Sequence, residues 1–254
     1  MERLRQPLQG VKNIIRFNWH FYLLSLGLIL VISLLNIFFN GSYLIYGKIL
    51  CSLIIVTTII SILISFYIYD LSDLYKLQWI DSVAIATKGQ IINIHSGFDE
   101  TSVLLKEKFP EAKLTVLDFY DPLKHTEVSI KRARKAYPPF ENTISVSTRD
   151  LALNDNSADN IFVIFAAHEI RDENERVSFF GQLKKTLKPD GSIVVIEHLR
   201  DLPNFGVYNI GAFHFITKSS WFRVFKEANL VLHDQFKFTP FISIFILKKN
   251  GIKY

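Results

Sequence analysis

The chain has 254 residues, 49% of them hydrophobic, and a formal net charge of +5. This length allows one full domain with an appendage, and a mean hydropathy of +0.22 is high for a wholly soluble protein. The single cysteine, Cys51, excludes an intrachain disulfide and a cysteine-based zinc site.

Two uncharged apolar segments, residues 21–39 and 49–69, account for the high hydropathy. Each is close to the ~20 residues that a helix needs to cross the hydrocarbon core of a bilayer. The first is longer than the apolar part of a signal peptide and leads through a turn sequence, Asn40-Gly41-Ser42, into the second. We therefore predict two transmembrane helices, at about residues 19–39 and 49–69, rather than a cleaved signal peptide or two buried core helices.

The basic residues around these segments predict their orientation. Four precede the first segment, whereas only Lys48 lies in the short connection; the four are Arg3, Arg5, Lys12 and Arg16. The positive-inside rule then places the N-terminus in the cytoplasm, and two spans return the chain to the same side. We expect an integral membrane protein with both termini and its folded domain in the cytoplasm.

The rest of the chain alternates strand-like and helix-like segments. We expect a tail and two transmembrane helices in residues 1–70, an amphipathic linker helix in residues 71–82, and an α/β domain in residues 83–254. The predicted strands are residues 90–95, 113–119, 143–148, 160–167, 192–198, 230–238 and 241–249, and the predicted helices are residues 100–109, 122–137, 174–187 and 221–228. Apolar strands that alternate with helices favour a parallel sheet covered on both faces. The last two strands, joined through Thr239-Pro240, are too closely connected to be parallel.

The turn after the first predicted strand is a candidate ligand site. Open parallel sheets bind ligands at the carboxyl ends of their strands, and Gly97 lets the backbone turn tightly there. Asp118 ends the second strand about twenty residues later, where a carboxylate accepts hydrogen bonds from ribose hydroxyls. The alternative is a turn glycine and a capping aspartate of the kind found in any α/β protein.

Three further segments extend this pattern. Asp155-Asn156-Ser157-Ala158-Asp159 precedes the fourth strand, Ala167-His168-Glu169-Ile170 follows it, and Leu187-Lys188-Pro189-Asp190-Gly191 precedes the fifth. Together they resemble class I S-adenosylmethionine (SAM)-dependent methyltransferases, which show "DNSFD" and "LKPGG" at these places. The resemblance covers roughly residues 83–249. It implies a Rossmann-like sheet of seven strands with an antiparallel last strand, and SAM as cofactor.

The resemblance also implies which residues bind SAM. The family pattern is an acidic residue followed by three spaced glycines; here Asn93 stands at the acidic position, and His95, Gly97 and Asp99 stand at the glycine positions. Asp118 matches the ribose-binding acid, Phe119 the residue that packs on adenine, and Ser147 the adenine-binding acid. The implied cofactor-binding residues are Asn93, Ser96, Gly97, Asp118, Phe119, Ser147, Thr148 and Phe165.

Candidate catalytic residues follow the fourth and fifth strands. His168 and Glu169 follow the fourth, and Glu197 and His198 end the fifth, while His214 lies in an aromatic stretch further on. A neutral histidine accepts a proton near pH 7, so we predict His168 and His198 as bases that the two glutamates orient. The alternative is a structural histidine at each position. The spacing matches no metal motif, and we predict no metal.

The predicted function is a membrane-anchored SAM-dependent methyltransferase that acts on a lipophilic small molecule, such as a quinone, isoprenoid, pigment precursor or lipid. The alternatives are a membrane-tethered binding module with a degenerate cofactor loop, or a domain of this fold with non-methylation chemistry. A basic cluster in residues 124–135 is either a solvated helix face or a contact for anionic lipid headgroups. Without a recognisable nucleic-acid module we predict no nucleic-acid partner. The accepting atom and the oligomeric state stay open.

Overall fold

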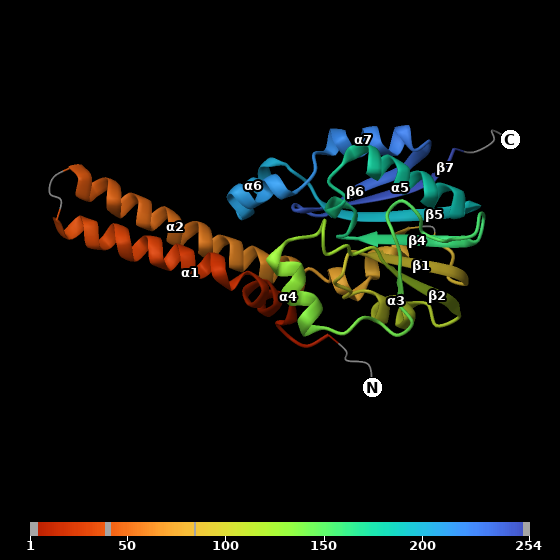
Figure 1. Cartoon of the computed structure of the whole chain (residues 1–254), viewed down its shortest axis with the longest axis horizontal. Helices are drawn as coiled ribbons and strands as arrows, with labels where there is room; N and C mark the ends of the chain where they lie inside the picture. The colour runs from red at the N-terminus through yellow and green to blue at the C-terminus, as the bar shows by residue number, and fades with distance from the viewer. Residues whose placement is uncertain (1–4, 39–41, 84, 251–254) are drawn as a thin grey trace.

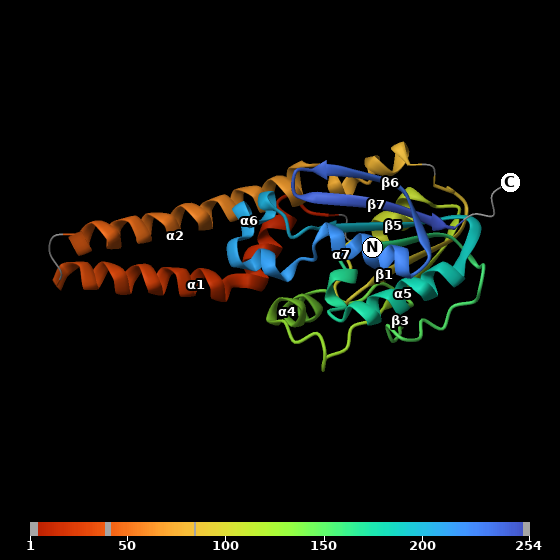
Figure 2. The same cartoon turned by 90° about the horizontal axis from the view of Figure 1, so that it is seen from above.

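A computed structural model describes residues 5–38, 42–83 and 85–250 of the chain. Two long helices, α1 (Gln9–Phe38) and α2 (Ser42–Phe66), lie side by side as a hairpin that projects from one end of an α/β domain (Figures 1 and 2). Asn40 and Gly41 of the predicted turn lie outside the described residues.

Helix α1 has two parts. At Asn18 the backbone leaves helical geometry, with φ −113° and ψ 15°. The part before Asn18 lies against the domain, where Phe17 is buried, and the part after it is the apolar segment. The helix therefore starts well before the predicted span at residue 19, because its first two turns have the domain to pack on.

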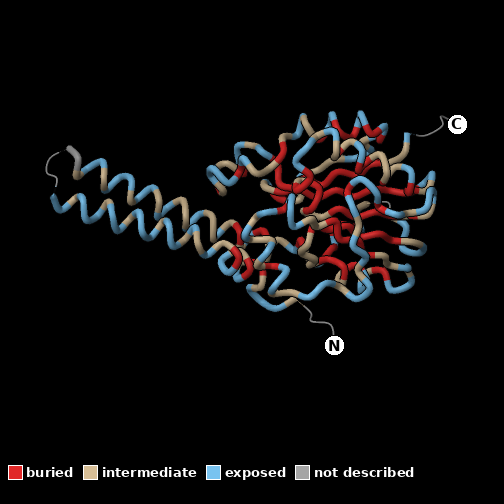
Figure 3. The backbone as a smooth tube through the Cα atoms, viewed as in Figure 1, coloured by how far each residue is buried: buried red, intermediate tan, exposed pale blue. Residues whose placement is uncertain are grey.

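The outer parts of both helices consist of exposed and half-buried residues (Figure 3), and many of the exposed ones are large and apolar. Leu24 of α1 is 66% exposed and Leu63 of α2 is 58% exposed. Both helices are long and apolar enough to cross a membrane. Exposing such a surface to water is costly.

Short helical turns replace the linker helix expected over residues 71–82. They are a π-helical turn η1 (Tyr67–Leu71) and two 3-10 turns, η2 (Leu74–Lys76) and η3 (Gln78–Ser82). Asp73 and Leu77 have φ angles of 62° and 53°, which interrupt an α-helix. The apolar residues of the predicted linker helix are nevertheless buried, because the turns place Leu74, Leu77 and Ile80 against one face of the sheet.

The domain is built on one seven-stranded sheet. Its strands are β1 (Gly89–His95), β2 (Ala112–Asp118), β3 (Ile144–Ser145), β4 (Ala158–Ile164), β5 (Leu187–His198), β6 (Leu230–Thr239) and β7 (Ile242–Lys249). The order is β3-β2-β1-β4-β5-β7-β6, with β7 antiparallel to both neighbours and the remaining pairs parallel. The predicted Rossmann-like sheet of seven strands with an antiparallel insertion is confirmed.

Helices cover both faces of the sheet. They are α3 (Ser102–Lys108), α4 (Val128–Ala136), α5 (Glu173–Thr186), α6 (Leu202–Tyr208) and α7 (Lys218–Glu227), with 3-10 turns η4 (Ala167–Glu169) and η5 (Asn209–His214). On one face, Phe180 of α5 and Trp221 of α7 are fully buried against the sheet. On the other, Leu105 of α3 belongs to one buried cluster with Ile68 of η1, directly after the hairpin, and Trp79 of η3. The base of the hairpin is thus part of the domain core.

Polar contacts fix the hairpin to the domain beside the end of β1. Glu100 Oε1 accepts hydrogen bonds from Arg5 Nη1 at 2.9 Å and from Asn13 Nδ2 at 3.1 Å, and its Oε2 accepts one from Tyr75 Oη at 2.8 Å. Asp70 caps the start of α1 by accepting from the backbone N–H groups of residues 10 and 11 at 2.9 and 2.8 Å. One glutamate therefore joins α1, the linker turns and the turn after β1.

Replacing Glu100 with alanine is expected to loosen this attachment. Three donors lose their acceptor at a largely buried site, so we expect the free energy of unfolding to fall by about 2–3 kcal/mol. Hydrogen exchange should accelerate in residues 67–82 and at the start of α1 but not in β5. Glu107→Ala, on the exposed side of α3, is the control and should leave exchange unchanged. Equal exchange in both variants would contradict this role for Glu100.

Candidate active site

The turn after β1 requires a glycine. Gly97 has φ +96°, a backbone conformation that side chains disfavour. A Cβ atom there would lie 2.9 Å from Tyr120 Cδ2 and 3.0 Å from Arg134 Cδ. The turn therefore passes directly beneath the side chains of Tyr120 and Arg134.

Asp118 lies beside this turn, as predicted. It ends β2 at the position paired with His95 of β1, and it is 5% exposed. Its carboxylate accepts hydrogen bonds from the Tyr120 N–H at 2.9 Å and from Arg134 Nη1 at 2.5 Å. Arg134 also donates to the Gly97 carbonyl at 3.3 Å and stacks on the Tyr120 ring. This arginine of α4 thus covers both predicted cofactor-binding features.

Side chains replace the glycines in the rest of the loop. Asn93 Nδ2 donates to Thr101 Oγ1 at 3.0 Å, and Asp99 Oδ1 accepts from the Thr101 and Ser102 N–H groups, both at 2.9 Å. Three side-chain atoms are buried here without a hydrogen-bond partner among the described residues: Asn93 Oδ1, His95 Nε2 and Asp99 Oδ2. The loop is ordered by its own side chains, and three polar atoms stay available.

The other predicted cofactor-binding residues lie around this edge. Ser96 is buried within the turn, and Phe119 is 2% exposed with its ring edge-on to Phe179 of the core. Ser147 and Thr148 follow β3, which is shorter than predicted because only two residues pair with β2 before the chain turns. Phe165 follows β4 with φ 49°.

His168 lies in a charged network at the ends of β4 and β5. Its ring Nδ1 is 2.7 Å from Glu197 Oε2, and its ring Nε2 is 3.2 Å from Glu169 Oε1. Its backbone N–H donates to Glu197 Oε1 at 3.2 Å. Burial alone would lower the pKa of His168, but the two carboxylates outweigh it and raise that pKa to about 10. The ring is therefore an imidazolium at neutral pH, a form that donates hydrogen bonds and does not accept a proton.

His198 lies on the opposite face of the sheet, although it follows Glu197 directly. Adjacent residues of a strand point to opposite faces. The His198 ring stacks between Phe165 and Phe215, its Nε2 is 2.8 Å from Tyr69 Oη, and its Nδ1 is 3.1 Å from the Phe241 carbonyl. These contacts suit a neutral ring that donates through Nδ1 and accepts from the tyrosine. His198 thus links the hairpin base to β5 and stays apart from the His168 network.

The two predicted bases therefore have different surroundings. Burial lowers the pKa of His198 to about 4. Since the unfolded pKa is about 6.5, the unfolded chain binds a proton between these values that the folded chain does not.

Acidification is therefore expected to reduce stability through His198. Its contribution to the free energy of unfolding is complete above pH 6.5 and is lost as the pH falls toward 4. At pH 5 the loss is about 2 kcal/mol. Thermal unfolding of the full chain in detergent at pH 7.5 and pH 5 measures this change. The reference is His198→Gln, which retains an acceptor for Tyr69. A reference is needed because the raised pKa of His168 makes stability change with pH in the opposite direction, and this effect is present in both proteins. Identical pH profiles for the two proteins would contradict this assignment.

Two residues of the site, Arg134 and His214, carry only a weak sequence signal. Arg134 belongs to the basic cluster that the sequence predicts as a solvated face or a headgroup contact. His214, in η5, brings its Nε2 to 3.3 Å from Glu169 Oε1, next to His168. Only its place between two aromatic residues marked it in the sequence.

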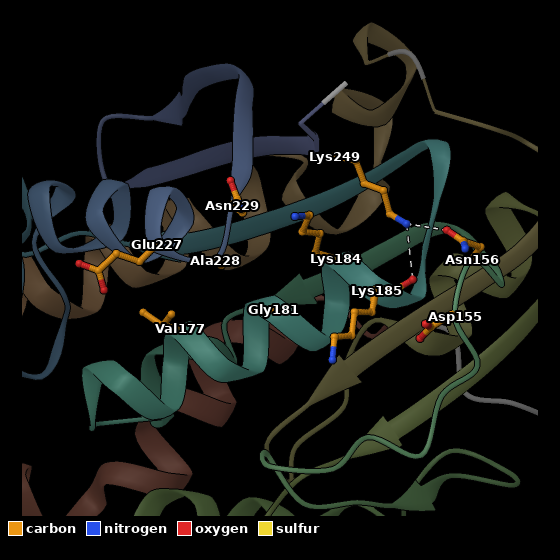
Figure 4. A pocket seen from close by; sticks show the side chains of 10 residues that line it. All are labelled: Asp155, Asn156, Val177, Gly181, Lys184, Lys185, Glu227, Ala228, Asn229 and Lys249. Carbon is orange, nitrogen blue, oxygen red and sulfur yellow. Dashed lines mark hydrogen bonds between the residues drawn. The ribbon is translucent and has the colours of Figure 1, made fainter. Parts of the chain in front are cut away.

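A pocket at the other end of the sheet does not belong to this site. It is lined by residues that precede β4 and β6 and by the ends of α5 and β7, including Asn156, Lys185, Asn229 and Lys249 (Figure 4). Lys249 Nζ donates to Asn156 Oδ1 at 2.6 Å across it. This is the amino end of the parallel strands, away from the edge where such sheets bind ligands.

The comparisons with known proteins agree with this architecture. Residues 96–195 match the family model described as "Methyltransferase domain". Solved structures of similar fold include a SAM-dependent methyltransferase from Aquifex aeolicus, with 14% identity, a TM-score of 0.53, and coverage of 75% of this chain and 97% of that chain. Human N-acetylserotonin methyltransferase in complex with SAM has 14% identity and a TM-score of 0.52, covering 77% of this chain and 56% of that chain. The search of curated proteins found no match.

A third structure is geranyl diphosphate C-methyltransferase from Streptomyces coelicolor A3(2), with 12% identity, a TM-score of 0.51, and coverage of 70% of this chain and 79% of that chain. At these identities the likeness establishes the fold. Together with the match of residues 96–195 to the family model, it confirms the class I methyltransferase fold predicted from the sequence. The cofactor of this class is SAM.

The residues at the carboxyl edge fit SAM in the following respects. Gly97 makes the tight turn, and Asp118 presents a carboxylate at the ribose position. The buried atoms of Asn93, His95 and Asp99 that lack a hydrogen-bond partner among the described residues offer polar contacts at the strand end. The Arg134 side chain fills part of this space, but it is 37% exposed and held at its tip, so it can turn toward solvent. The fit therefore depends on movement of one arginine.

Proposed function

We propose that the protein is a SAM-dependent methyltransferase whose cofactor site is the carboxyl edge of β1 and β2. The observation that carries this proposal is the register of the two strands, which sets the end of β1, with its glycine turn, beside Asp118. Asp118 would hold the ribose hydroxyls, and the loop of residues 93–99 would hold the amino-acid end. SAM supplies an electrophilic methyl group, and the neighbouring ends of β4 and β5 face the acceptor.

The protein's own residues at β4 and β5 would orient the acceptor. Of the predicted catalytic residues, His168, Glu169 and Glu197 form one network, with His168 held as a hydrogen-bond donor. We propose that this network aligns an acceptor oxygen at the ends of β4 and β5. We assign His198 to a structural role.

We further propose that the hairpin spans a membrane with the domain on the cytoplasmic side, and that the acceptor is lipophilic. The exposed apolar surface of both helices supports the span. The hairpin also meets the site, because Phe17 of α1 packs edge-on against Phe98, next to the Gly97 turn, at a ring distance of 5.5 Å. A substrate dissolved in the bilayer would reach the site along this junction.

Basic residues at the junction support this orientation. Arg132 of α4 donates to the Phe17 carbonyl at 2.6 Å and lies over the Trp19 ring at 4.7 Å. Lys131 and Lys135 on the same helix are exposed. Cationic side chains beside an interfacial tryptophan suit the anionic cytoplasmic leaflet.

Calorimetry of the full chain in nanodiscs, titrated with SAM and with S-adenosylhomocysteine, tests the cofactor. Binding of both is expected. A folded protein that binds neither would contradict the proposal. Incubation with methyl-labelled SAM and a membrane lipid extract should then give a lipophilic product heavier by one methyl group, and another mass change would indicate different chemistry.

A membrane-tethered binding module is the second candidate function. The ion pair between Arg134 and Asp118, in the place of a cofactor, favours it. Such a module would stay folded and bind no SAM even when Arg134 is replaced with alanine, whereas the proposed enzyme would bind SAM in both forms.

A further inference from the structure

Two histidines and one glutamate converge at the carboxyl ends of β4 and β5. One ligand atom from each of His168, Glu169 and His214 lies within 4.8 Å of the others. Glu169 Oε1 stands between the rings, 3.2 Å from His168 Nε2 and 3.3 Å from His214 Nε2. Three donor atoms from two distant segments thus face one point.

The two separations from Glu169 Oε1 match those between neighbouring ligands of one metal ion. Two atoms that each lie about 2.0–2.1 Å from a zinc ion, at a tetrahedral angle, are about 3.3 Å apart. Without a metal, the same separations are those of hydrogen-bonded ion pairs. The donor set of two imidazoles and one carboxylate is the combination found in catalytic zinc sites and in other first-row divalent sites.

A carboxylate holds the other nitrogen of each histidine. His168 Nδ1 is 2.7 Å from Glu197 Oε2, and His214 Nδ1 is 2.7 Å from Glu127 Oε1. Ligating histidines almost always give their second nitrogen to such an acceptor, which orients the ring and strengthens the ligand. Both rings therefore present Nε2 to the same point and have an acceptor behind them. Glu197 is fully buried, so its orientation is fixed by the core.

We propose that His168, Glu169 and His214 bind one divalent transition-metal ion, with zinc as the best match, while Glu197 and Glu127 position the two histidines. The nearby group of carboxylates suits a dication, and metal binding would displace the proton that His168 carries on Nε2. The sequence does not suggest the site, because His214 lies far along the chain from the adjacent pair and the spacing matches no motif.

The site has an open side. Three protein ligands leave a fourth zinc position for water or a substrate oxygen. Arg171 lies against this side: it donates to the His214 carbonyl at 2.6 Å, and its Nη2 is 2.8 Å from His214 Nε2 and 4.0 Å from Glu169 Oε2. This side chain is 46% exposed, and metal binding requires it to turn away from His214 Nε2 toward solvent. If the proposed function holds, the open position marks the acceptor as a compound with an oxygen donor, such as a hydroxyl, whose pKa the metal lowers.

Metal content and cobalt spectroscopy of the full chain test this inference. The protein, purified in detergent, is stripped with a chelator, dialysed and loaded with Zn²⁺ or Co²⁺. We expect one zinc per chain and the intense visible absorption of tetrahedral Co²⁺. His214→Ala, at a partly exposed position, should lower zinc affinity at least 100-fold, and Glu197→Gln should lower it about 10–100-fold. His233→Ala, on the exposed side of β6, is the matched control and should change nothing.

Failure to retain zinc would overturn the inference, as would equal zinc affinity in His214→Ala and His233→Ala. SAM binding is measured on the same samples. Loss of zinc binding alone contradicts the metal site and leaves the proposed function standing. Absence of SAM binding in a zinc-loaded protein contradicts the proposed function and leaves the metal site standing.

Discussion

Replacing Asp118 with alanine is expected to reduce SAM affinity at least 100-fold. In the proposed complex its carboxylate accepts hydrogen bonds from both ribose hydroxyls, and each hydrogen bond to a charged group contributes about 1.5–3 kcal/mol. Loss of two such bonds corresponds to about 3 kcal/mol or more, which is a factor of 100 in Kd. Calorimetry with SAM measures the loss, and thermal unfolding checks that the variant stays folded.

Arg134→Ala is the matched control for this experiment. In the described structure Arg134 holds the same carboxylate that the ribose would use, so its removal should leave SAM affinity intact or raise it up to about 5-fold, the range of a partly exposed ion pair. Loss of affinity in Asp118→Ala together with retention in Arg134→Ala locates the ribose at β2. Wild-type affinity in Asp118→Ala would contradict the assignment.

The sequence predicts the sheet well because its strands are short apolar runs bounded by turns. Leu187-Lys188-Pro189-Asp190-Gly191 marks the entry to β5, and Thr239-Pro240 marks the antiparallel hairpin, where the structure has β6 and β7. The secondary structure was less predictable where tertiary packing overrides the local sequence pattern. The linker residues show helical spacing, yet their backbone breaks at Asp73 and Leu77 because the side chains fill the space under β1 and β4.

The proximity of candidate site residues was predictable from the sequence where these residues end neighbouring strands. Gly97 and Asp118 each end a strand, and parallel neighbours bring them together. The sequence also indicates that Glu197 and His198 lie on opposite faces of the sheet, because successive residues of a strand face opposite sides. Arg134 and His214 were not predictable in this way, since a helix and a 3-10 turn bring them in from segments whose positions depend on the whole fold.

Replacing Glu197 with alanine is expected to destabilise the protein by about 3–5 kcal/mol. Its carboxylate is fully buried in β5, and both of its oxygens accept hydrogen bonds from His168. Removing one partner of a buried pair leaves the other uncompensated, a backbone N–H unpaired and a cavity in the core. For a domain of this size, the thermal midpoint should fall by roughly 6–20 °C.

Two comparisons separate the charge of Glu197 from its volume. Glu197→Gln fills the same space and still offers an acceptor to His168, so it should cost less than the alanine variant, about 1–2 kcal/mol. Glu111→Ala removes an exposed glutamate that pairs with Lys88 and should change stability by less than about 0.5 kcal/mol. If Glu197→Ala were no more destabilising than Glu111→Ala, the buried pair would not hold the ends of β4 and β5 together. The expected result is a large loss of stability in the alanine variant and a small loss in the glutamine variant. It would show that the carbonyl oxygen at this position, more than its charge, fixes the His168 ring.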